Sequence, residues 1–153
     1  MKLSRDIAGQ NFIVTGAARG IGLAISTLFS SLGARVSGWD LDVSDMQENS
    51  IFADAQVVDV TDEAATLSGF AASLQRLGDI DGIIANAGIN GPTKPMWEYS
   101  LTEWDAVMGV DLTGVFLTVK ASLDHFQTRE RGRIIIISSI AGKEGNPGAV
   151  PYG

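Results

Sequence analysis

The stretch that decides the fold is Thr15-Gly16-Ala17-Ala18-Arg19-Gly20-Ile21-Gly22. It follows a short apolar run, Phe12-Ile13-Val14, and it leads into residues 21–32, whose apolar side chains recur at helical spacing until Gly33. Glycines at such a junction let the backbone turn sharply and let a pyrophosphate approach without a Cβ in the way. The first turn of the helix offers free N–H groups and a partial positive charge. The stretch therefore predicts a strand–turn–helix unit that binds phosphate groups.

Strand-like and helix-like segments alternate along the rest of the chain. Apolar runs and helical periodicity predict strands at residues 35–39, 56–58, 82–85 and 134–137, and helices at residues 62–77 and from Ser100 to about Arg129. Thr61 is the expected N-cap of the helix at 62–77, and Gly78 its stop. The second helix opens on a capping box, Ser100 with Glu103. This order predicts an α/β fold, a Rossmann-type doubly wound parallel sheet with helices on both faces, as one domain over residues 1–153.

Two apolar patterns predict burial. In the long helix a stripe of apolar side chains recurs at spacings of three or four, and further apolar residues widen it, so we expect one face on the sheet and one on a partner. The stripe consists of Trp104, Met108, Leu112, Val115, Val119, Leu123 and Phe126, widened by Val107, Val110 and Leu117. The run Ile134-Ile135-Ile136-Ile137 has no alternation, which is typical of a strand covered on both faces.

Composition excludes several classes of protein. Apolar residues make up 45% of the chain and charged residues 19%, which is the balance of a folded domain rather than a disordered chain. The net charge of −7 disfavours binding to nucleic acid and to anionic membranes. The chain has no cysteine and one histidine, so no metal site is expected. The charged start, Met1 to Asp6, is not a signal peptide, and no run resembles a membrane span; we expect a cytoplasmic protein.

Asp40 at the end of the second predicted strand indicates which dinucleotide is bound. It lies 18 residues after Gly22, where a carboxylate accepts both ribose hydroxyls of adenosine and repels a 2′-phosphate. The alternative is that Asp40 caps a helix or lies in a solvated turn. Arg19 is a basic residue in the turn that could pair with a 2′-phosphate. The pattern favours NAD over NADP.

Together these residues resemble the short-chain dehydrogenase/reductase family, and the likeness covers essentially all 153 residues. The motifs that carry it are Thr15 to Gly22 (T-G-x-x-x-G-I-G), Asp59-Val60 after the third strand, Asn86-Ala87-Gly88 after the fourth, Ile137-Ser138-Ser139 at the end of the fifth, and Tyr152, 13 residues after Ser139. The resemblance implies a cofactor site made of Gly16, Ala18, Arg19, Gly20, Ile21, Gly22, Asp40, Asp59, Val60, Asn86, Ala87 and Gly88.

The resemblance also implies catalytic roles. Tyr152 would give or take the hydroxyl proton, and the hydroxyl of Ser139 would hold the substrate oxygen. A free phenol has a pKa of about 10, too high for a good base near neutrality. The family lowers it with a lysine four positions after the tyrosine, which falls past Gly153. Taken singly, Ser139 would be a turn serine, Tyr152 a packed or surface tyrosine, and Asn86 a structural turn residue; His125 is expected on a helix surface with no role.

Asp111 departs from the family pattern. It lies in Val110-Asp111-Leu112-Thr113-Gly114, at the place of an asparagine that helps to order a water chain to the lysine. An ionised aspartate only accepts hydrogen bonds, so the proton relay would be altered. Asp111 is therefore included with Ser139 and Tyr152 as a catalytic candidate.

The resemblance further implies that two strands and a substrate-covering loop of the family fold lie outside these residues. The isoleucine strand would then be a sheet edge, and we expect the 153-residue chain alone to aggregate and to be inactive.

The function expected from the resemblance is hydride transfer between NAD(H) and a secondary alcohol or ketone, with a small-molecule alcohol or carbonyl substrate. We expect the full-length protein to be a homodimer or homotetramer. The alternatives are an NADPH enzyme like the 3-oxoacyl-carrier-protein reductases, a non-catalytic dinucleotide-binding module, and, least supported, a structural protein.

Overall fold

A computed structural model describes residues 7–152, so the prediction that the chain does not start with a signal peptide, made on residues 1–6, lies outside the described residues. Five parallel strands form one sheet in the order β3-β2-β1-β4-β5. The strands are β1 (Asn11–Thr15), β2 (Arg35–Asp40), β3 (Asp54–Val57), β4 (Gly82–Ala85) and β5 (Arg133–Ile136). The strand order reverses between β1 and β4, as the doubly wound prediction requires.

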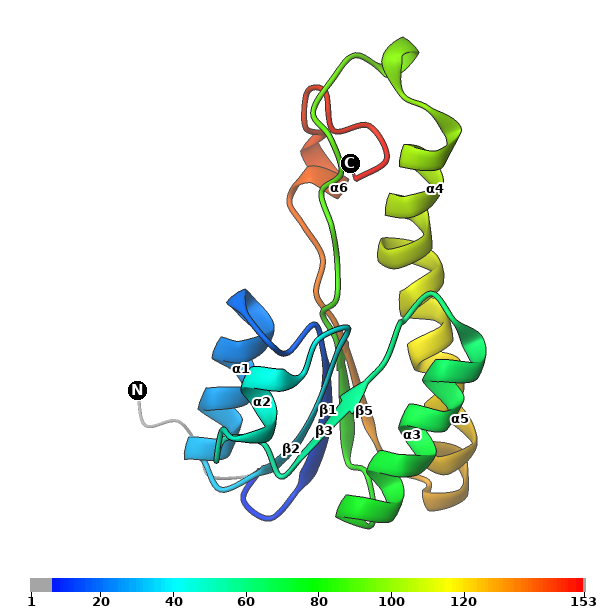
Figure 1. The fold of residues 1–153 in the computed structure, drawn as a ribbon. Helices are drawn as coiled ribbons and strands as arrows, with labels where there is room; N and C mark the ends of the chain where they lie inside the picture. Colours follow the sequence, from blue (N-terminus) through cyan, green and yellow to red (C-terminus); the bar gives the residue numbers. More distant parts are fainter. Residues whose placement is uncertain (1–6, 153) are drawn as a thin grey trace.

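Helices cover both faces of the sheet, which confirms the predicted α/β, Rossmann-type fold (Figure 1). On one face α1 packs against β1 and β2, and α2 lies beside β3; on the other, α3 packs against β2 and β3, and α5 against β4. The helices are α1 (Gly20–Ser31), α2 (Ser44–Gln47), α3 (Glu63–Leu77), α4 (Leu101–Met108), α5 (Val115–Arg129) and α6 (Ala141–Glu144), with a 3-10 turn η1 (Met96–Glu98) and a π-helical segment η2 (Gly109–Gly114).

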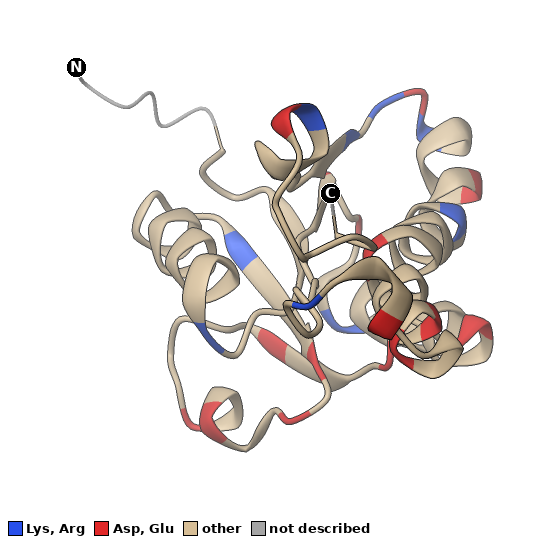
Figure 2. Ribbon diagram, turned by 90° about the horizontal axis from the view of Figure 1, so that it is seen from above, with Lys and Arg blue, Asp and Glu red and all other residues tan. Residues whose placement is uncertain are grey.

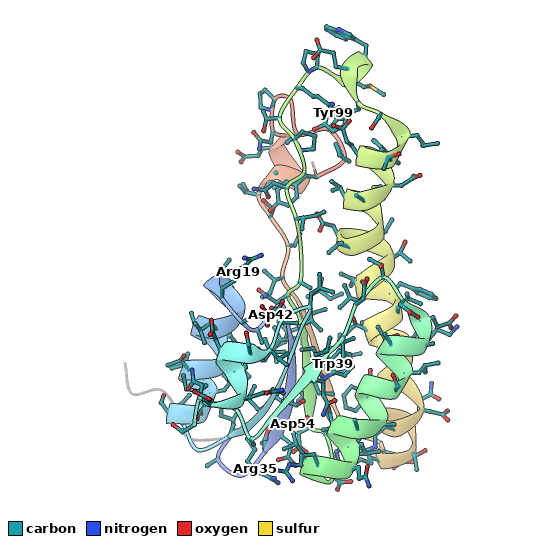
Figure 3. The ribbon with its side chains drawn as sticks, viewed as in Figure 1. Arg19, Arg35, Trp39, Asp42, Asp54 and Tyr99 are labelled. Carbon is teal, nitrogen blue, oxygen red and sulfur yellow. The ribbon has the colours of Figure 1, made fainter. Side chains whose placement is uncertain are left out.

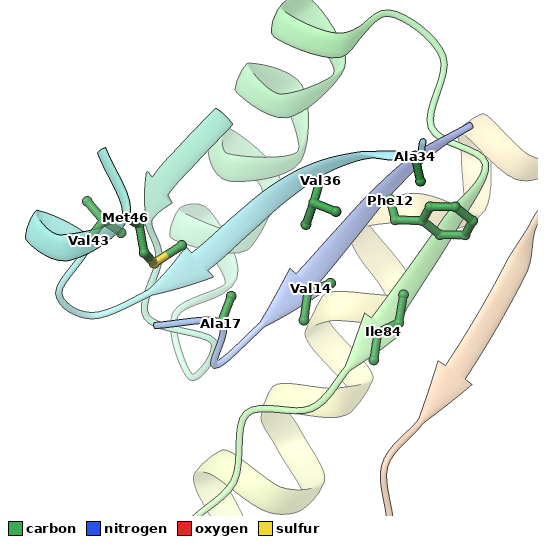
Figure 4. Packing of buried hydrophobic residues seen from close by; sticks show 8 residues of the cluster. All are labelled: Phe12, Val14, Ala17, Ala34, Val36, Val43, Met46 and Ile84. Carbon is green, nitrogen blue, oxygen red and sulfur yellow. The ribbon is translucent and has the colours of Figure 1, made fainter. Parts of the chain in front are cut away.

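Side chains of β1 alternate between two cores, because successive residues of a strand point to opposite faces. Phe12 and Val14 pack with Val36 and Ile84 beneath α1 (Figure 4). Ile13 lies in the opposite cluster with Trp39, beneath α3 and α5. The two cores hold the central strands in place. Helices α4 and α6 both lie beyond the carboxyl ends of these strands (Figure 1).

The N-cap residue of α3 differs from the predicted one. Thr61 was the expected N-cap, but the helix begins one residue later, and the carboxylate of Asp62 accepts hydrogen bonds from the amides of Ala64 and Ala65. The hydroxyl of Thr61 instead donates to Asp59 over 2.7 Å. Gly78 ends the helix with a φ of +85°, as predicted.

The long helix is also different from the prediction. The run Leu101–Arg129 is helical throughout, but η2 divides it, and there Gly114 approaches Val60 so closely that a Cβ would lie 2.8 Å from its Cγ2. The side facing the domain is formed largely by Val107, Gly114, Leu117, Thr118, Ser122 and Phe126. Most of the predicted stripe lies one residue away from this side, and its Leu112 is 60% exposed.

The sequence predicted that the single histidine, His125, lies on a helix surface, and this prediction is wrong. His125 is half-buried, its ring lies 5.7 Å from that of Phe70 between centroids, and its Nε2 accepts the amide of Ile80 over 3.1 Å. It therefore joins α5 to the start of β4.

The isoleucine run forms the edge strand β5, which pairs with β4 alone. The side chains of Ile134, Ile135 and Ile136 are 38%, 45% and 53% exposed, so the strand is not covered on both faces here. Edge strands of this kind invite pairing with another strand.

Seen from above, Lys and Arg are scattered over several elements rather than gathered on one face (Figure 2). Contrary to the expectation that no run resembles a membrane span, the helical run Leu101–Arg129 is long and apolar enough to cross a membrane by length and composition, since its most apolar 18-residue stretch has a mean hydropathy of 1.5. In the structure its α5 portion packs on α3 and β4, and a core helix meets the same criteria.

Candidate functional site

The site lies where the strand order reverses, at the carboxyl ends of β1 and β4. In open α/β sheets ligands bind at this point, because the connections leave for opposite faces and a crevice opens between them. The hydroxyl of Thr15, at the end of β1, accepts hydrogen bonds from the amides of Asn86 and Ala87, each over 2.9 Å. The side-chain amide of Asn86 donates in return to the carbonyls of Thr15 (2.9 Å) and Gly16 (3.2 Å). These bonds join the two strand ends into one floor.

The glycine turn after β1 depends on two glycines. Gly16 has a φ of +62°, in the left-handed region that residues with a Cβ rarely adopt. Gly22 is buried in the first turn of α1, where a Cβ would lie 2.1 Å from the carbonyl oxygen of Gly16 and 2.7 Å from Nδ2 of Asn86. Only glycine at position 22 lets the helix begin directly beneath the turn.

The first turn of α1 has no side-chain cap. Its N-cap residue, Arg19, is extended and makes no capping hydrogen bond, and the turn holds no acidic residue. The first amides of a helix have no partner within it, so those of α1 remain for a ligand. Arg19 itself is exposed at the start of the helix (Figure 3).

Asp40 faces this turn from the end of β2. Its Oδ2 accepts the amide of Ala18 over 3.0 Å, and its Oδ1 accepts the amide of Leu41 over 2.8 Å. Each carboxylate oxygen has a further lone pair, so Asp40 can still accept hydroxyl groups. The carboxylate is half-buried and lines a cavity with the turn.

Asp59 and Val60, the pair after β3, form the adjoining wall. Oδ1 of Asp59 accepts the amide and the hydroxyl of Thr61, over 2.9 and 2.7 Å, which fixes the exposed carboxylate at the rim. Val60 is buried and packs against Gly114 of η2.

Two cavities open at this edge of the sheet. The first, of about 310 Å³, is lined by these predicted cofactor residues: Gly16, Arg19, Ile21, Asp40, Asp59, Val60, Asn86, Ala87 and Gly88. The predicted residues Ala18, Gly20 and Gly22 do not line it; they shape the turn beside it. The second cavity, of about 530 Å³, shares Ile21 and the segment Asn86–Gly88 with the first, so the two adjoin.

The three catalytic candidates, Asp111, Ser139 and Tyr152, line the second cavity. Ser139 follows β5, and its hydroxyl accepts the amide of Ala141 over 3.2 Å at the start of α6. Tyr152 is half-buried, on a turn in which its amide donates to the carbonyl of Ala149 over 3.1 Å. The structure thus brings residues from η2, the end of β5 and the last described turn to one cavity.

A contact that the sequence did not indicate fastens the turn before Tyr152. The carbonyl of Gly148 accepts the amide of Lys94 over 2.8 Å and the hydroxyl of Tyr99 over 2.9 Å. The hydroxyl of Tyr99 also contacts the carbonyl of Pro92 (Figure 3). The irregular loop after β4 is therefore hydrogen-bonded to the segment that carries Tyr152.

An ion pair fixes the far end of the same loop. Nζ of Lys94 lies 2.7 Å from both carboxylate oxygens of Glu103. The hydrogen bond from Lys94, followed by those from the backbone and hydroxyl of Ser100, lowers the pKa of Glu103 to about 2. The capping box predicted from Ser100 and Glu103 is present, and its carboxylate serves the loop as well.

Asp111 holds the near end of the loop. Its Oδ1 accepts the amide of Ile89 over 2.8 Å, whereas its Oδ2 is buried and has no hydrogen-bond partner among the described residues. Burial raises the pKa of this carboxyl, against the opposing effect of the Ile89 hydrogen bond.

Comparison with known proteins identifies the family. The family model described as short chain dehydrogenase matches residues 10–153. The chain belongs to the short-chain dehydrogenase family. Its structure superposes on that of an NAD+-bound xylitol dehydrogenase with a TM-score of 0.92 and 30% identity, over 97% of this chain and 60% of that one.

Curated relatives within the short-chain dehydrogenases carry several activities. A 2-dehydro-3-deoxy-L-rhamnonate dehydrogenase (NAD(+)) of Sphingomonas sp. (strain SKA58) is 35% identical over 95% of this chain and 59% of its own length. An acetoacetyl-CoA reductase of Synechocystis sp. (strain ATCC 27184 / PCC 6803 / Kazusa) is 36% identical over 98% of this chain and 61% of its own length. This short-chain dehydrogenase chain spans about three fifths of such relatives.

Proposed function

We propose that the protein is an oxidoreductase that transfers hydride between NAD(H) and a secondary alcohol or ketone. The observation that carries the proposal is that two cavities adjoin across Ile21 and the segment Asn86–Gly88: one is lined by the glycine turn and Asp40, the other by Ser139 and Tyr152. A dinucleotide laid across Ile21 and the floor after β4 would extend from the first cavity into the second.

The residues of the first cavity fit an adenine dinucleotide. The uncapped amides of α1 suit a pyrophosphate, because they are hydrogen-bond donors at the positive end of the helix dipole. The carboxylate of Asp40 suits the ribose hydroxyls, and Asp59 with Val60 would flank the adenine. The missing Cβ of Gly22 makes this cradle possible.

The residues of the second cavity fit the chemistry of a carbonyl and an alcohol. When bound, the nicotinamide supplies the hydride donor or acceptor. In the oxidative direction Tyr152 would take the hydroxyl proton of the substrate, and in the reductive direction it would return that proton. The hydroxyl of Ser139 would hold the substrate oxygen by a hydrogen bond.

We propose NAD rather than NADP as the cofactor. A 2′-phosphate on the adenosine ribose would meet the carboxylate of Asp40, which would have to move or be protonated. An NADPH-dependent reductase of 3-oxoacyl groups is the second candidate, favoured by the exposed Arg19 beside the same position. One relative is an acetoacetyl-CoA reductase, which also reduces a 3-oxoacyl group.

Assembly and location belong to the same proposal. The side chains of Leu112, Phe116 and Leu123 are 60%, 59% and 41% exposed along the outer side of the long helix, which supports a homodimer or homotetramer in the full-length protein. The acidic, scattered surface charge supports a cytoplasmic protein that binds neither nucleic acid nor membrane.

Turnover by the full-length protein tests the proposal, because the family's lysine partner of the tyrosine falls past Gly153. We expect Tyr152→Phe and Ser139→Ala to lower kcat on a panel of secondary alcohols and ketones by about 10²-fold or more, since proton transfer by a positioned group contributes factors of this size. The affinity for NAD+, measured by calorimetry, should change much less than kcat, because the residues proposed to bind the pyrophosphate, ribose and adenine are outside the two substitutions and line or border the first cavity. Unchanged turnover in both variants would refute the catalytic roles. Binding of NAD+ without any turnover in the wild type would favour the non-catalytic module.

A further inference from the structure

The segment between α6 and Tyr152 packs against the rest of the fold only near its two ends. Ala141 in α6 is buried, residues 142–147 are all exposed, and Ala149 and Pro151 are buried again. Packing of residues 142–147 therefore does not determine the path by which the chain reaches Tyr152. That path depends on the contacts at Gly148, where the chain rejoins the fold.

Two donors from the loop after β4 hold Gly148. Its carbonyl accepts the amide of Lys94 over 2.8 Å and the hydroxyl of Tyr99 over 2.9 Å. The two backbones approach closely, since a Cβ at Gly148 would lie 3.0 Å from Cγ2 of Thr93 and 3.3 Å from the amide nitrogen of Lys94. The φ of Gly148 is +79°, in the left-handed region that residues with a Cβ rarely adopt. The contact therefore depends on glycine at this position.

The hydroxyl of Tyr99 joins two segments of the chain. It also contacts the carbonyl of Pro92, so its single proton lies between a carbonyl of the loop and a carbonyl of the turn. The described residues that line the two cavities do not include Tyr99, which is half-buried outside them. Its hydroxyl therefore contacts backbone and not the space proposed for substrate and dinucleotide.

The loop that carries Tyr99 is itself fixed to the long helix. Nζ of Lys94 lies 2.7 Å from both carboxylate oxygens of Glu103. It also lies 5.3 Å from the centre of the Tyr99 ring, in position for a cation–π contact. At the other end of the loop, Asp111 accepts the amide of Ile89 over 2.8 Å. A loop fixed at both ends is a firm support for the turn that it contacts.

The turn that Tyr99 contacts leads directly to Tyr152. The amide of Tyr152 donates to the carbonyl of Ala149 over 3.1 Å, so residues 149–152 form one turn, and Gly148 comes immediately before it. A displacement at Gly148 would therefore displace the phenol in the second cavity. Catalytic groups need to be held within about 0.5 Å of their productive geometry, and a misplacement of about 1 Å can cost about 100-fold in rate.

We propose that Tyr99 is a positioning residue for Tyr152. Its hydroxyl, together with the amide of Lys94, fixes the carbonyl of Gly148 and with it the turn that presents Tyr152 to the second cavity. The fixation of this turn is a property of the fold, whereas its effect on turnover rests on the proposed function.

Hydrogen exchange of backbone amides in the full-length protein tests the fixation without any need for turnover. Tyr99→Phe removes the hydroxyl and keeps the ring. We expect the amides of Lys94 and Tyr152 to exchange about 3–10-fold faster than in the wild type, the factor that one hydrogen bond contributes, while that of Ala64 at the start of α3 does not change. Unchanged exchange at Lys94 and Tyr152 would overturn the proposal.

Turnover per NAD+-binding site distinguishes positioning from a loss of folded protein. We expect kcat per site on secondary alcohols and ketones to fall by about 10-fold in Tyr99→Phe, with a much smaller change in NAD+ affinity. The matched control is Ser68→Ala, because the exposed Ser68 on α3 also donates its hydroxyl to a backbone carbonyl, that of Ala65, over 3.1 Å. This control should equal the wild type in both measurements.

The two measurements separate the failure of this inference from the failure of the proposed function. Faster exchange at Tyr152 with an unchanged kcat per site would refute the positioning role. A wild type without any turnover would refute the proposed function instead, and the exchange result would still decide whether Tyr99 fixes the turn.

Discussion

Helices α1 and α3 both follow a strand of the same sheet, but their first turns are built differently. In α3 the carboxylate of Asp62 accepts two amides of the first turn, over 2.8 and 3.2 Å. In α1 the N-cap residue is Arg19, whose side chain caps nothing. A capping side chain stabilises a helix by about 1 kcal/mol. Among the described helices of more than two turns that follow a strand directly, α1 lacks this stabilisation, and its first turn lies beside the predicted dinucleotide cavity.

We infer from this difference that the first turn of α3 is built for stability and that of α1 for the proposed dinucleotide. The amides that Asp62 satisfies in α3 are left in α1 for an anion, whose binding would stabilise the folded chain in proportion to its concentration over its Kd. Gly22 and Asp40 belong to the same arrangement, because one lets the turn approach and the other orients it. Changes at α1 should therefore alter dinucleotide affinity, and changes at α3 should alter stability alone.

The largest effect is expected from Gly22→Ala. The new methyl group would lie 2.1 Å from the carbonyl oxygen of Gly16, so the turn must shift. We expect binding of NAD+ to fall below detection in calorimetry and the free energy of unfolding to fall by about 1–3 kcal/mol, as in other overpacked sites. Gly109→Ala is the control, because its Cβ would meet only Thr61, at 3.7 Å. Equal NAD+ affinity in the two variants would show that the turn does not hold the phosphates.

Arg19→Asp should give the first turn of α1 a capping carboxylate, like the one that Asp62 provides in α3. Arg19 already has the extended backbone of a capping residue, so an aspartate there can accept the first amides. We expect the ligand-free protein to gain about 0.5–1 kcal/mol in its free energy of unfolding and NAD+ affinity to drop by about 100-fold, because the carboxylate occupies the amides and repels the pyrophosphate.

The matched control for that exchange is Asp62→Ala in α3. It should cost about 1 kcal/mol of stability and leave NAD+ affinity unchanged. If Arg19→Asp bound NAD+ as tightly as the wild type, the first turn of α1 would not be the phosphate site.

A smaller effect is expected from Asp40→Ser, measured as the ratio of NAD+ to NADP+ affinity. Loss of the charged acceptor should cost about 1.5 kcal/mol, the low end of the range for such hydrogen bonds, because the serine hydroxyl still accepts one bond; NAD+ should therefore bind about 10-fold more weakly. The affinity for NADP+ should rise, because the repulsion of a 2′-phosphate is gone. The exposed Asp42, which bonds only within its own turn to Ser44, gives the control Asp42→Ser. A ratio that stays constant in Asp40→Ser would remove Asp40 from cofactor selection.

The sequence predicted β1, β4 and β5 well because each contains a short apolar run next to a glycine or a polar turn. It placed the ends of β1, β2 and β4 within a residue or two of their positions, and hence the sheet edge that forms the site. The switch between β1 and β4 follows from the order of the elements, since parallel strands need crossovers.

The parts that the sequence did not predict depend on long-range contacts. The side of the long helix that faces the domain holds Gly114, Thr118 and Ser122, small residues that allow close packing and give no apolar signal. Of the predicted stripe, Phe126 is buried as expected, whereas Leu112 and Leu123 are exposed. The contacts of Tyr99 and Lys94 with the carbonyl of Gly148 join residues about 50 positions apart, and no local pattern indicates them.

The account depends on a dinucleotide lying against the uncapped start of α1. Amide NMR of the full-length protein during titration with NAD+ tests this most directly. The account predicts that the amides of Gly16, Ala18, Gly20, Ile21 and Gly22 shift most, while those of Ala64 and Ala65 at the start of α3 do not move. Shifts of equal size at both helices, or shifts that leave residues 16–22 untouched, would contradict it.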